Sequence, residues 1–328
     1  MRLGKALSGI AVGAALAVAS SACSVPGDNA AQGANTVVDG PVKIGFSQAT
    51  QQSPFYVALT DAAKAEAQAQ GNEFFYADAN GDVTKQNNDV QDLITRGINV
   101  LVINPVDPMG VTPSLTAAEA AGIKVVTVDR PVESGAAAFV GRDNKAMGQL
   151  VGKAAVETLG PSGGKIIQIQ GDAGGAVARD RGEGFKTAVS AQPNIAVVDG
   201  PYADYTRSKA VTAMQDLLQA HPDLKAVYAQ NDDMALGALQ VLTENHRRDV
   251  KVFGVDGLME AVRAIAAGDQ YIATALNDPN AEGQLAVQTA VKAARGESVP
   301  EFVDAGTSLV NKSNAQALVG ESTFAATK

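Results

Sequence analysis

Residues 100–129, VLVINPVDPMGVTPSLTAAEAAGIKVVTVD, contain a strand pattern, a helix pattern and a second strand pattern in succession. The two ends, 100–105 and 125–129, are short runs rich in valine, which is typical of buried strands. The middle, 110–122, is rich in alanine and ends in glycine, the residue that most often follows a helix C-terminus. This order predicts a βαβ unit with two parallel strands.

The same alternation extends through the chain from residue 41. Two further helix candidates, 55–71 and 84–97, also end in glycine. The repeated order predicts an α/β protein whose parallel sheets are covered by helices on both faces. A length of 328 residues with 46% hydrophobic side chains is enough for two domains, each with its own core. The strand candidates are 42–47, 74–78, 100–105, 125–129, 165–170, 195–200, 226–232, 250–256 and 271–276.

The first residues have the layout of a secretory signal. Arg2 and Lys5 precede an apolar run, 6–19, that carries no charge. The run is shorter than the roughly 20 residues of a membrane-spanning helix. We therefore expect a signal peptide over residues 1–22.

Cys23, the only cysteine, directly follows small residues and resembles the acylated cysteine of bacterial lipoproteins. Ser20 departs from that resemblance, because leucine usually stands three residues before the cysteine. We expect a lipidated tether over 23–40, rich in glycine, proline and asparagine, and a location on the outer face of the cell membrane. The alternatives are a plain cleaved signal, with a periplasmic location, and a buried free thiol.

The chain is acidic. Its formal net charge is −9, and loss of Arg2 and Lys5 with the signal peptide leaves −11. Nucleic-acid phosphates attract basic surfaces, and no basic cluster interrupts this sequence. We therefore expect no nucleic-acid partner.

Polar side chains stand where several of the predicted strands end. Ligands of open parallel sheets bind at the carboxyl ends of the strands, so these positions are candidates for a shared polar cleft. Each residue taken alone is equally a helix cap or a turn former. The positions are Asn104, Asp129 with Arg130, Gln170, Asn231 with Asp232, Asp256 and Asn277.

Side chains of these types suit a polyhydroxylated ligand. A ligand hydroxyl donates to a carboxylate and accepts from a guanidinium or an amide, and such charge-assisted bonds are strong. Aromatic rings cover the apolar faces of such a ligand. Phe55, Tyr56 and Tyr205 are candidates for this role, with simple core packing as the alternative.

Catalytic and metal sites have little support in the sequence. His221 and His246 lack the spacing of a metal-binding pair. The glycine-rich segments 160–165 and 171–175 lack the spacing of a nucleotide loop or a nucleophile turn. Segment 78–82 faintly resembles a calcium loop, but valine stands where the turn needs glycine, and a turn before a helix is the better interpretation. We expect no enzyme activity, no cofactor and no metal.

Six segments resemble the ribose-binding-protein branch of periplasmic sugar-binding proteins, and the similarity covers about residues 41–310. They are VKIGFSQATQQSPFYVAL (42–59), VQDLITRGINVLVINPVD (90–107), GIKVVTVDRP (122–131), VARDRGEGF (177–185), HPDLKAVYAQNDDMALGAL (221–239) and GVDG (254–257).

The resemblance implies a type I periplasmic binding protein, in which two similar α/β lobes are joined by a three-crossing hinge. The N-terminal lobe comprises 41–142 plus 278–304, and the C-terminal lobe 143–277 plus 305–328. The lobes close on a sugar, and the monomeric protein delivers it to the permease of an ABC importer. A sensor that presents its ligand to a membrane receptor is the alternative. A repressor with the same fold requires an N-terminal helix-turn-helix, where this chain has a secretion signal.

The resemblance also implies ligand-binding residues. The family pattern is changed at four of them: Ser53 replaces asparagine, Tyr56 and Tyr205 replace phenylalanine, and Asn277 replaces glutamine. These changes alter the space and the hydrogen-bonding groups, so we expect a pentose, or a tetritol or pentitol such as threitol or xylitol. The full set is Ser53, Phe55, Tyr56, Asn104, Asp129, Arg130, Arg181, Tyr205, Asn231, Asp256 and Asn277.

Overall fold

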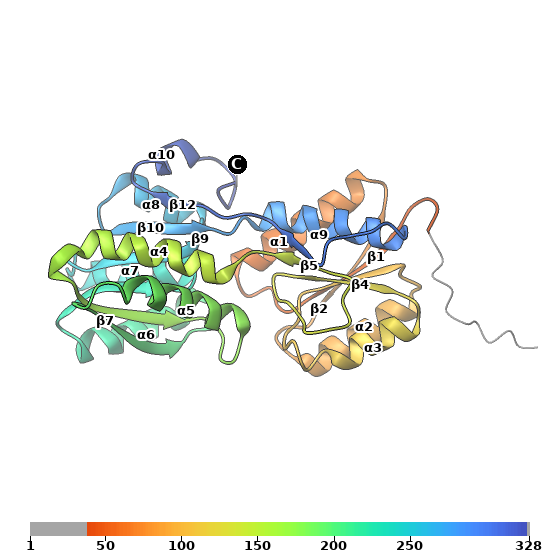
Figure 1. Cartoon of the computed structure of the whole chain (residues 1–328), viewed down its shortest axis with the longest axis horizontal. Helices are drawn as coiled ribbons and strands as arrows, with labels where there is room; N and C mark the ends of the chain where they lie inside the picture. The colour runs from red at the N-terminus through yellow and green to blue at the C-terminus, as the bar shows by residue number, and fades with distance from the viewer. Residues whose placement is uncertain (1–37, 327–328) are drawn as a thin grey trace, which may run out of the picture. The chain divides into compact units, whose positions relative to one another are not determined.

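The computed structural model describes residues 38–326 of the chain (Figure 1). The predicted signal peptide, Cys23 and most of the predicted tether lie outside these residues. Within 38–326, no helix is both long and apolar enough to cross a membrane. The described residues form two six-stranded sheets with helices packed against them.

The first sheet has the strand order β11-β5-β4-β3-β1-β2, and all its pairs are parallel. The βαβ unit predicted at 100–129 lies at its centre, where β3 and β4 pair in the register Val100 to Lys124 through Ile103 to Thr127. The strands are β1 Lys43–Gln48, β2 Glu73–Asp78, β3 Val100–Ile103, β4 Lys124–Val128, β5 Ala138–Gly141 and β11 Phe302–Asp304.

The second sheet has the strand order β12-β10-β9-β8-β6-β7. Its pairs are parallel except at the edge, where β12 runs antiparallel to β10. The two sheets therefore repeat the same design. The strands are β6 Gly164–Gln170, β7 Ile195–Tyr202, β8 Leu224–Ala229, β9 Lys251–Asp256, β10 Tyr271–Leu276 and β12 Leu309–Asn311.

Helices cover both faces of each sheet, because successive strand residues point to opposite faces. In β3, Val100 and Val102 belong to the core that α1 and α9 cover, whereas Leu101 and Ile103 pack with side chains of α2 and α3 (Figure 1). The helices are α1 Pro54–Ala69, α2 Val83–Thr95, α3 Thr112–Ala120, α4 Asn144–Leu159, α5 Ala176–Val189, α6 Arg207–Ala220, α7 Asp232–Glu244, α8 Met259–Ala267, α9 Pro279–Ala294 and α10 Ala315–Leu318, with a 3-10 turn at Gly160–Ser162.

Helix ends follow the signals in the sequence. Gly71, Gly97 and Gly122 come just after α1, α2 and α3 and have φ angles of 72°, 74° and 71°, a left-handed conformation that glycine adopts without a steric penalty. Asp82, in the segment with a faint calcium-loop pattern, caps α2 instead: its carboxylate accepts from two amides of the first turn.

The chain passes between the two sheets three times, after Gly141 of β5, Leu276 of β10 and Asp304 of β11. The predicted α/β architecture, with two sheets joined by three crossings, is therefore confirmed. We call the first sheet with its helices the N-terminal lobe and the second sheet with its helices the C-terminal lobe. The residue boundaries of the lobes stay a prediction.

Some strand predictions were wrong in detail. The short strands β5, β11 and β12 were missed, because three or four residues carry too little periodicity. The candidate at 226–232 ends at Ala229, and Asp232 is instead the first residue of α7. The reason is that the Asn231 side chain accepts from an amide of the first turn and so starts the helix there.

Candidate functional site

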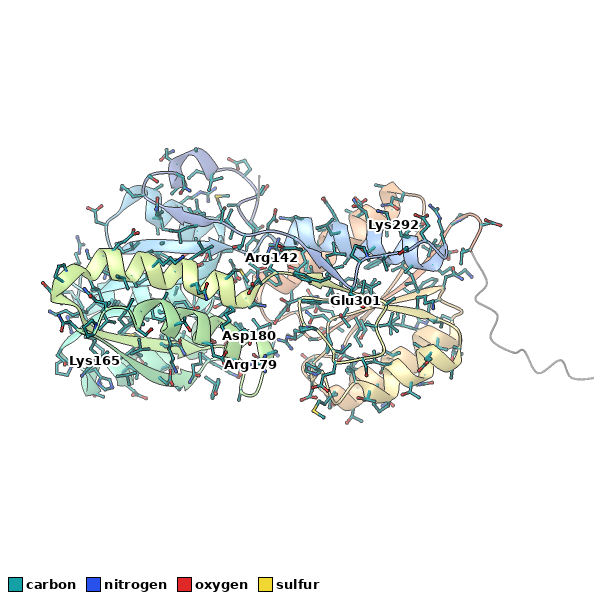
Figure 2. All side chains as sticks on the ribbon, viewed as in Figure 1. Arg142, Lys165, Arg179, Asp180, Lys292 and Glu301 are labelled. Carbon is teal, nitrogen blue, oxygen red and sulfur yellow. The ribbon has the colours of Figure 1, made fainter. Side chains whose placement is uncertain are left out.

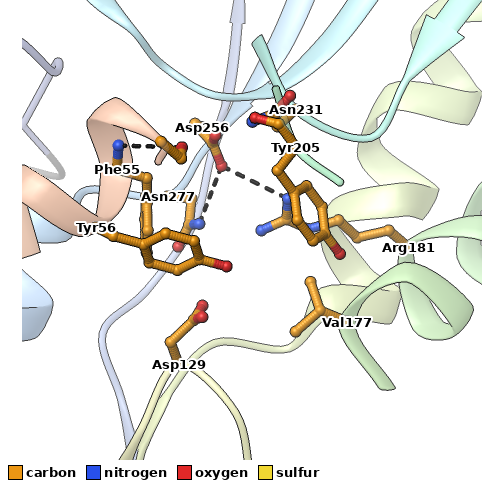
Figure 3. Close-up of a pocket in the computed structure, with 10 residues that line it drawn as sticks. Phe55, Tyr56, Asp129, Val177, Arg181, Tyr205, Asn231, Asp256 and Asn277 are labelled. Atoms are coloured by element: carbon orange, nitrogen blue, oxygen red, sulfur yellow. Dashed lines mark hydrogen bonds and ion pairs between the residues drawn. The ribbon is translucent and has the colours of Figure 1, made fainter. Parts of the chain in front are cut away.

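A cavity lies where carboxyl ends of strands from both sheets face each other (Figure 3). Its lining is Ser53, Phe55, Tyr56 and Asp129 from the N-terminal lobe, Val177, Arg181, Tyr205, Asn231 and Asp256 from the C-terminal lobe, and Asn277 from the second crossing.

Nine of the eleven residues predicted to bind a ligand line this cavity. The other two, Asn104 and Arg130, lie behind it and bond to residues that do line it. Val177, at the start of α5, lines the cavity but was not predicted, because an apolar residue at a helix start carries no functional signal.

Asp256 ends β9 and faces the cavity. Its Oδ1 accepts from Asn277 Nδ2 at 3.0 Å and lies 3.6 Å from Arg181 Nη1. Burial raises the pKa of Asp256 to about 8, although the Arg181 charge lowers it. Ligand hydroxyls that donate to Asp256 stabilise its charged form, and so oppose the effect of burial on this pKa.

Asp129 follows β4 and faces the cavity from the side opposite Asp256 (Figure 3). Its Oδ2 accepts from Asn104 Nδ2 at 3.4 Å and lies 3.8 Å from Arg130 Nε. Burial raises the pKa of Asp129, while the charges of Arg130 and Arg181 lower it. The cavity therefore has a buried carboxylate on each side.

Arg181 is held by neighbours from three separate segments, the start of α4 and the loops before α7 and α6. Its Nε donates to Asn144 Oδ1 at 2.9 Å and its Nη1 to the Gln230 carbonyl at 2.6 Å. The guanidinium also lies 6.0 Å from the centre of the Tyr205 ring, within the range of a cation–π contact. A cation held this rigidly can donate to a ligand without losing further side-chain freedom.

Tyr205 lies against the backbone of Gly171. A Cβ added at Gly171 falls 2.1 Å from Cζ of Tyr205, so the ring needs glycine at that position. The phenol oxygen is buried, and among the described residues it has no hydrogen-bond partner. An unpaired buried hydroxyl is costly, and a ligand hydroxyl can satisfy it.

The other two aromatic residues differ from Tyr205 in their contacts. Phe55 and Tyr56 meet edge to face with ring centres 5.7 Å apart, and Phe55 meets Phe324 of the C-terminal segment in the same way at 6.2 Å. The Tyr56 hydroxyl accepts from Arg130 Nη2 at 2.6 Å. These rings therefore form an apolar wall, and the Tyr56 phenol is already paired.

Arg130 supports the cavity from outside. Its Nη1 donates to the carbonyls of Pro105 and Val106 at 3.0 and 3.3 Å, and its Nη2 lies 3.5 Å from Asp172 Oδ2. Asp172 belongs to the loop after β6, so this ion pair joins the two lobes. Segment 171–175 shows no binding or catalytic motif in the sequence, so Asp172 was not predicted.

Three residues of the lining have backbone conformations that are unusual for residues with a side chain. The φ angles of Asp129, Tyr205 and Asp256 are 63°, 58° and 124°. Backbone strain of this kind concentrates at functional sites, where surrounding contacts hold it. Within residues 38–326, no group of three or more His, Cys, Asp and Glu side chains is arranged to hold a metal ion.

Comparisons with known proteins identify the family of this chain. Residues 44–298 match the family model described as a periplasmic binding protein domain. The chain is 35% identical over 286 residues to a ribose import binding protein of Bacillus subtilis, covering 87% of this chain and 92% of that protein. It is 32% identical over 235 residues to a xylitol-binding protein of Mycolicibacterium smegmatis, covering 71% and 67%.

Among solved structures, one is an ABC transporter solute-binding protein from Mycobacterium smegmatis with bound glycerol. It is 86% identical to this chain, with a TM-score of 0.87, and the match covers 88% of this chain and 100% of that one. The two curated proteins are named for ribose and xylitol, and the solved structure contains bound glycerol.

Proposed function

The chain belongs to the periplasmic binding protein family, and on this premise we propose that it captures a small sugar or sugar alcohol and delivers it to the permease of an ABC importer. The observation that carries this proposal is the buried cavity with a carboxylate on each side and an unpaired phenol. The protein works outside the cytoplasm as a monomer, releases its ligand chemically unchanged, and is held at the membrane by a lipid on Cys23.

The polar groups of the cavity match adjacent hydroxyls. Asp129 and Asp256 accept from ligand hydroxyls, and Arg181 and the Tyr205 phenol donate to them. A ligand with several hydroxyls can serve acceptors and donors at once, which a carboxylate or an amine cannot. The rings of Phe55 and Tyr56 then cover its C–H groups.

The similar proteins favour a small ligand. Two of them are named for ribose and xylitol, which have five carbons each, and the third is a structure with bound glycerol, which has three. A cyclic pentose or an open-chain tetritol or pentitol is therefore the ligand that we expect.

Binding closes the lobes by population shift. The N-terminal lobe, 41–142 plus 278–304, supplies one part of the contacts, and the C-terminal lobe, 143–277 plus 305–328, supplies the other. Only the closed form makes both sets, so the ligand stabilises that form by its differential affinity.

Titration calorimetry tests the proposal with D-ribose, other aldopentoses, erythritol, threitol, xylitol and glycerol. We expect at least one of them to bind with a dissociation constant in the micromolar range or below. Asp256→Ala should abolish that binding and still unfold cooperatively. If no member of the panel binds at millimolar concentration, the proposed ligand class is wrong.

A further inference from the structure

Arg142 is buried at the first crossing and touches the other two (Figure 2). At the second crossing, its Nη1 donates to Asn277 Oδ1 and its Nη2 to the Asp278 carbonyl, both at 2.8 Å. At the third crossing, its Nε donates to the Gly306 carbonyl at 2.6 Å, and its Nη2 reaches the Ala305 carbonyl at 3.5 Å. One guanidinium therefore ties together all three connections between the lobes.

Arg142 is also linked to the ligand cavity through one residue, Asn277. Asn277, which accepts from Arg142, donates through its Nδ2 to Asp256. The guanidinium can only donate, so it fixes the orientation of the Asn277 amide with Oδ1 toward Arg142 and Nδ2 toward Asp256. Without that constraint the amide can turn its oxygen to the Asp256 carboxylate, which repels it.

Arg142 also pairs with a buried carboxylate that does not line the cavity. Glu282 of α9 is buried and pairs with Arg142. Burial raises the pKa of Glu282 to about 8, while the Arg142 charge lowers it. Arg142 itself does not line the cavity.

We propose that Arg142 is a positioning residue that couples ligand contacts at Asp256 to the geometry of the three crossings; this rests on the proposed function. Lobe closure changes the backbone angles at the crossings. Because one side chain bonds to all three, a change at one crossing is transmitted to the others. Because that side chain also orients Asn277, the closed geometry and the ligand-binding geometry of Asp256 favour each other.

The variants must separate coupling from loss of the fold. Removing Arg142 alone leaves Glu282 as an unpaired buried charge, which is strongly destabilising. The main variant is therefore Arg142→Met combined with Glu282→Gln, compared with Glu282→Gln alone. Arg142→Lys keeps the charge beside Glu282, but an ammonium cannot reproduce the planar fork that reaches all these acceptors. Arg207→Met is the control, since Arg207 also pairs with carboxylates, those of Asp233 and Glu260, but lies away from the cavity and the crossings.

Small-angle X-ray scattering of the ligand-free protein tests the hinge role without any ligand. We expect the double variant and Arg142→Lys to broaden the distribution of interatomic distances and raise the radius of gyration, and Arg207→Met to leave both as in the wild type. Scattering curves of Arg142→Lys and the double variant that overlay the wild type overturn the proposal. If the double variant does not fold, the Arg142→Lys result decides.

Calorimetry with glycerol and the tetritols, pentitols and aldopentoses above tests the coupling. We expect the double variant to bind the ligand at least tenfold more weakly than Glu282→Gln does. We also expect the Asp256→Asn substitution to reduce affinity by a smaller factor when it is added to the double variant than when it is made in the wild type. Affinity within twofold of Glu282→Gln overturns the coupling. If the wild type binds none of these compounds, the proposed function is wrong. The scattering experiment then still tests the role of Arg142 at the hinge, because it uses no ligand.

Discussion

Two tyrosines of the cavity have the same side chain and opposite hydrogen-bonding states. The Tyr56 hydroxyl accepts from Arg130, whereas the buried Tyr205 hydroxyl has no partner among the described residues. We expect Tyr205→Phe to weaken ligand binding about fivefold, the equivalent of about 1 kcal/mol for one lost hydrogen bond. The stability of the ligand-free protein should be unchanged or higher, because an unpaired polar group is removed.

Tyr56→Phe is the comparison, and we expect it to lower the free energy of unfolding by about 1 kcal/mol, because Arg130 Nη2 loses an acceptor. Urea denaturation of the two ligand-free variants and calorimetry with a panel ligand provide both quantities. A stability loss in Tyr205→Phe equal to that in Tyr56→Phe contradicts the assignment of its phenol to the ligand.

The identity of most cavity residues was predictable from the sequence, but their orientation was not. Strict alternation along β4 sends Asp129 and Arg130 to opposite sides. The left-handed φ of Asp129 changes that geometry: its carboxylate faces the cavity, and Arg130 turns to Tyr56 and the Pro105 carbonyl. No sequence pattern marks a non-glycine residue for this conformation, because tertiary contacts hold it.

At the scale of elements, Asp232 at the start of α7 fixes the end of β9. Its carboxylate accepts from the amides of Gly257 and Leu258 at 2.7 and 2.8 Å, from Tyr271 Oη at 2.6 Å and from Thr274 Oγ1 at 2.7 Å. Two of these bonds hold the backbone directly after Asp256, whose φ of 124° is unfavourable for a residue with a side chain. One acidic side chain thus joins a helix and two strands at the site.

We expect Asp232→Ala to lower the free energy of unfolding by roughly 3 kcal/mol or more, because four buried donors lose their acceptor. Asp232→Asn should fold but bind the ligand more weakly, since an amide cannot accept from all four donors and the strained Asp256 backbone relaxes. Asp233→Asn is the neighbouring control; Asp233 pairs with Arg207 and does not line the cavity. Equal affinity of Asp232→Asn and Asp233→Asn for a panel ligand would show that Asp232 does not position Asp256.

Sequence patterns predict the ends of helices correctly where those ends depend on adjacent residues. The glycines after α1, α2 and α3 are such signals, because each depends on a few adjacent residues. The roles of Asp232 and Arg142 depend on partners 25 to 164 residues away along the chain, and no local pattern encodes those contacts. This is why Asp232 was predicted only as a strand-end residue, and residue 142 only as the end of a lobe segment.

At the scale of the whole molecule, the Arg130–Asp172 ion pair joins the lobes without any ligand. The pair is partly shielded from water, since 11% of the Arg130 side chain and 26% of the Asp172 side chain are exposed. It therefore adds to the stability of the closed form independently of the groups that touch the ligand. A contact that exists only after closure slows reopening and has little effect on the first encounter.

We expect Asp172→Ala to raise the ligand dissociation rate roughly threefold to tenfold and to leave the association rate within twofold of the wild type. Asp180→Ala is the control, because Asp180 pairs with Arg179 on the same helix, so that this ion pair does not join the two lobes.

Stopped-flow tyrosine fluorescence can follow both rates, since the chain has no tryptophan and two of its six tyrosines line the cavity. Raised salt should reduce the difference between wild type and Asp172→Ala by screening the pair. A slower association rate with unchanged dissociation would assign Asp172 to ligand entry instead of closure.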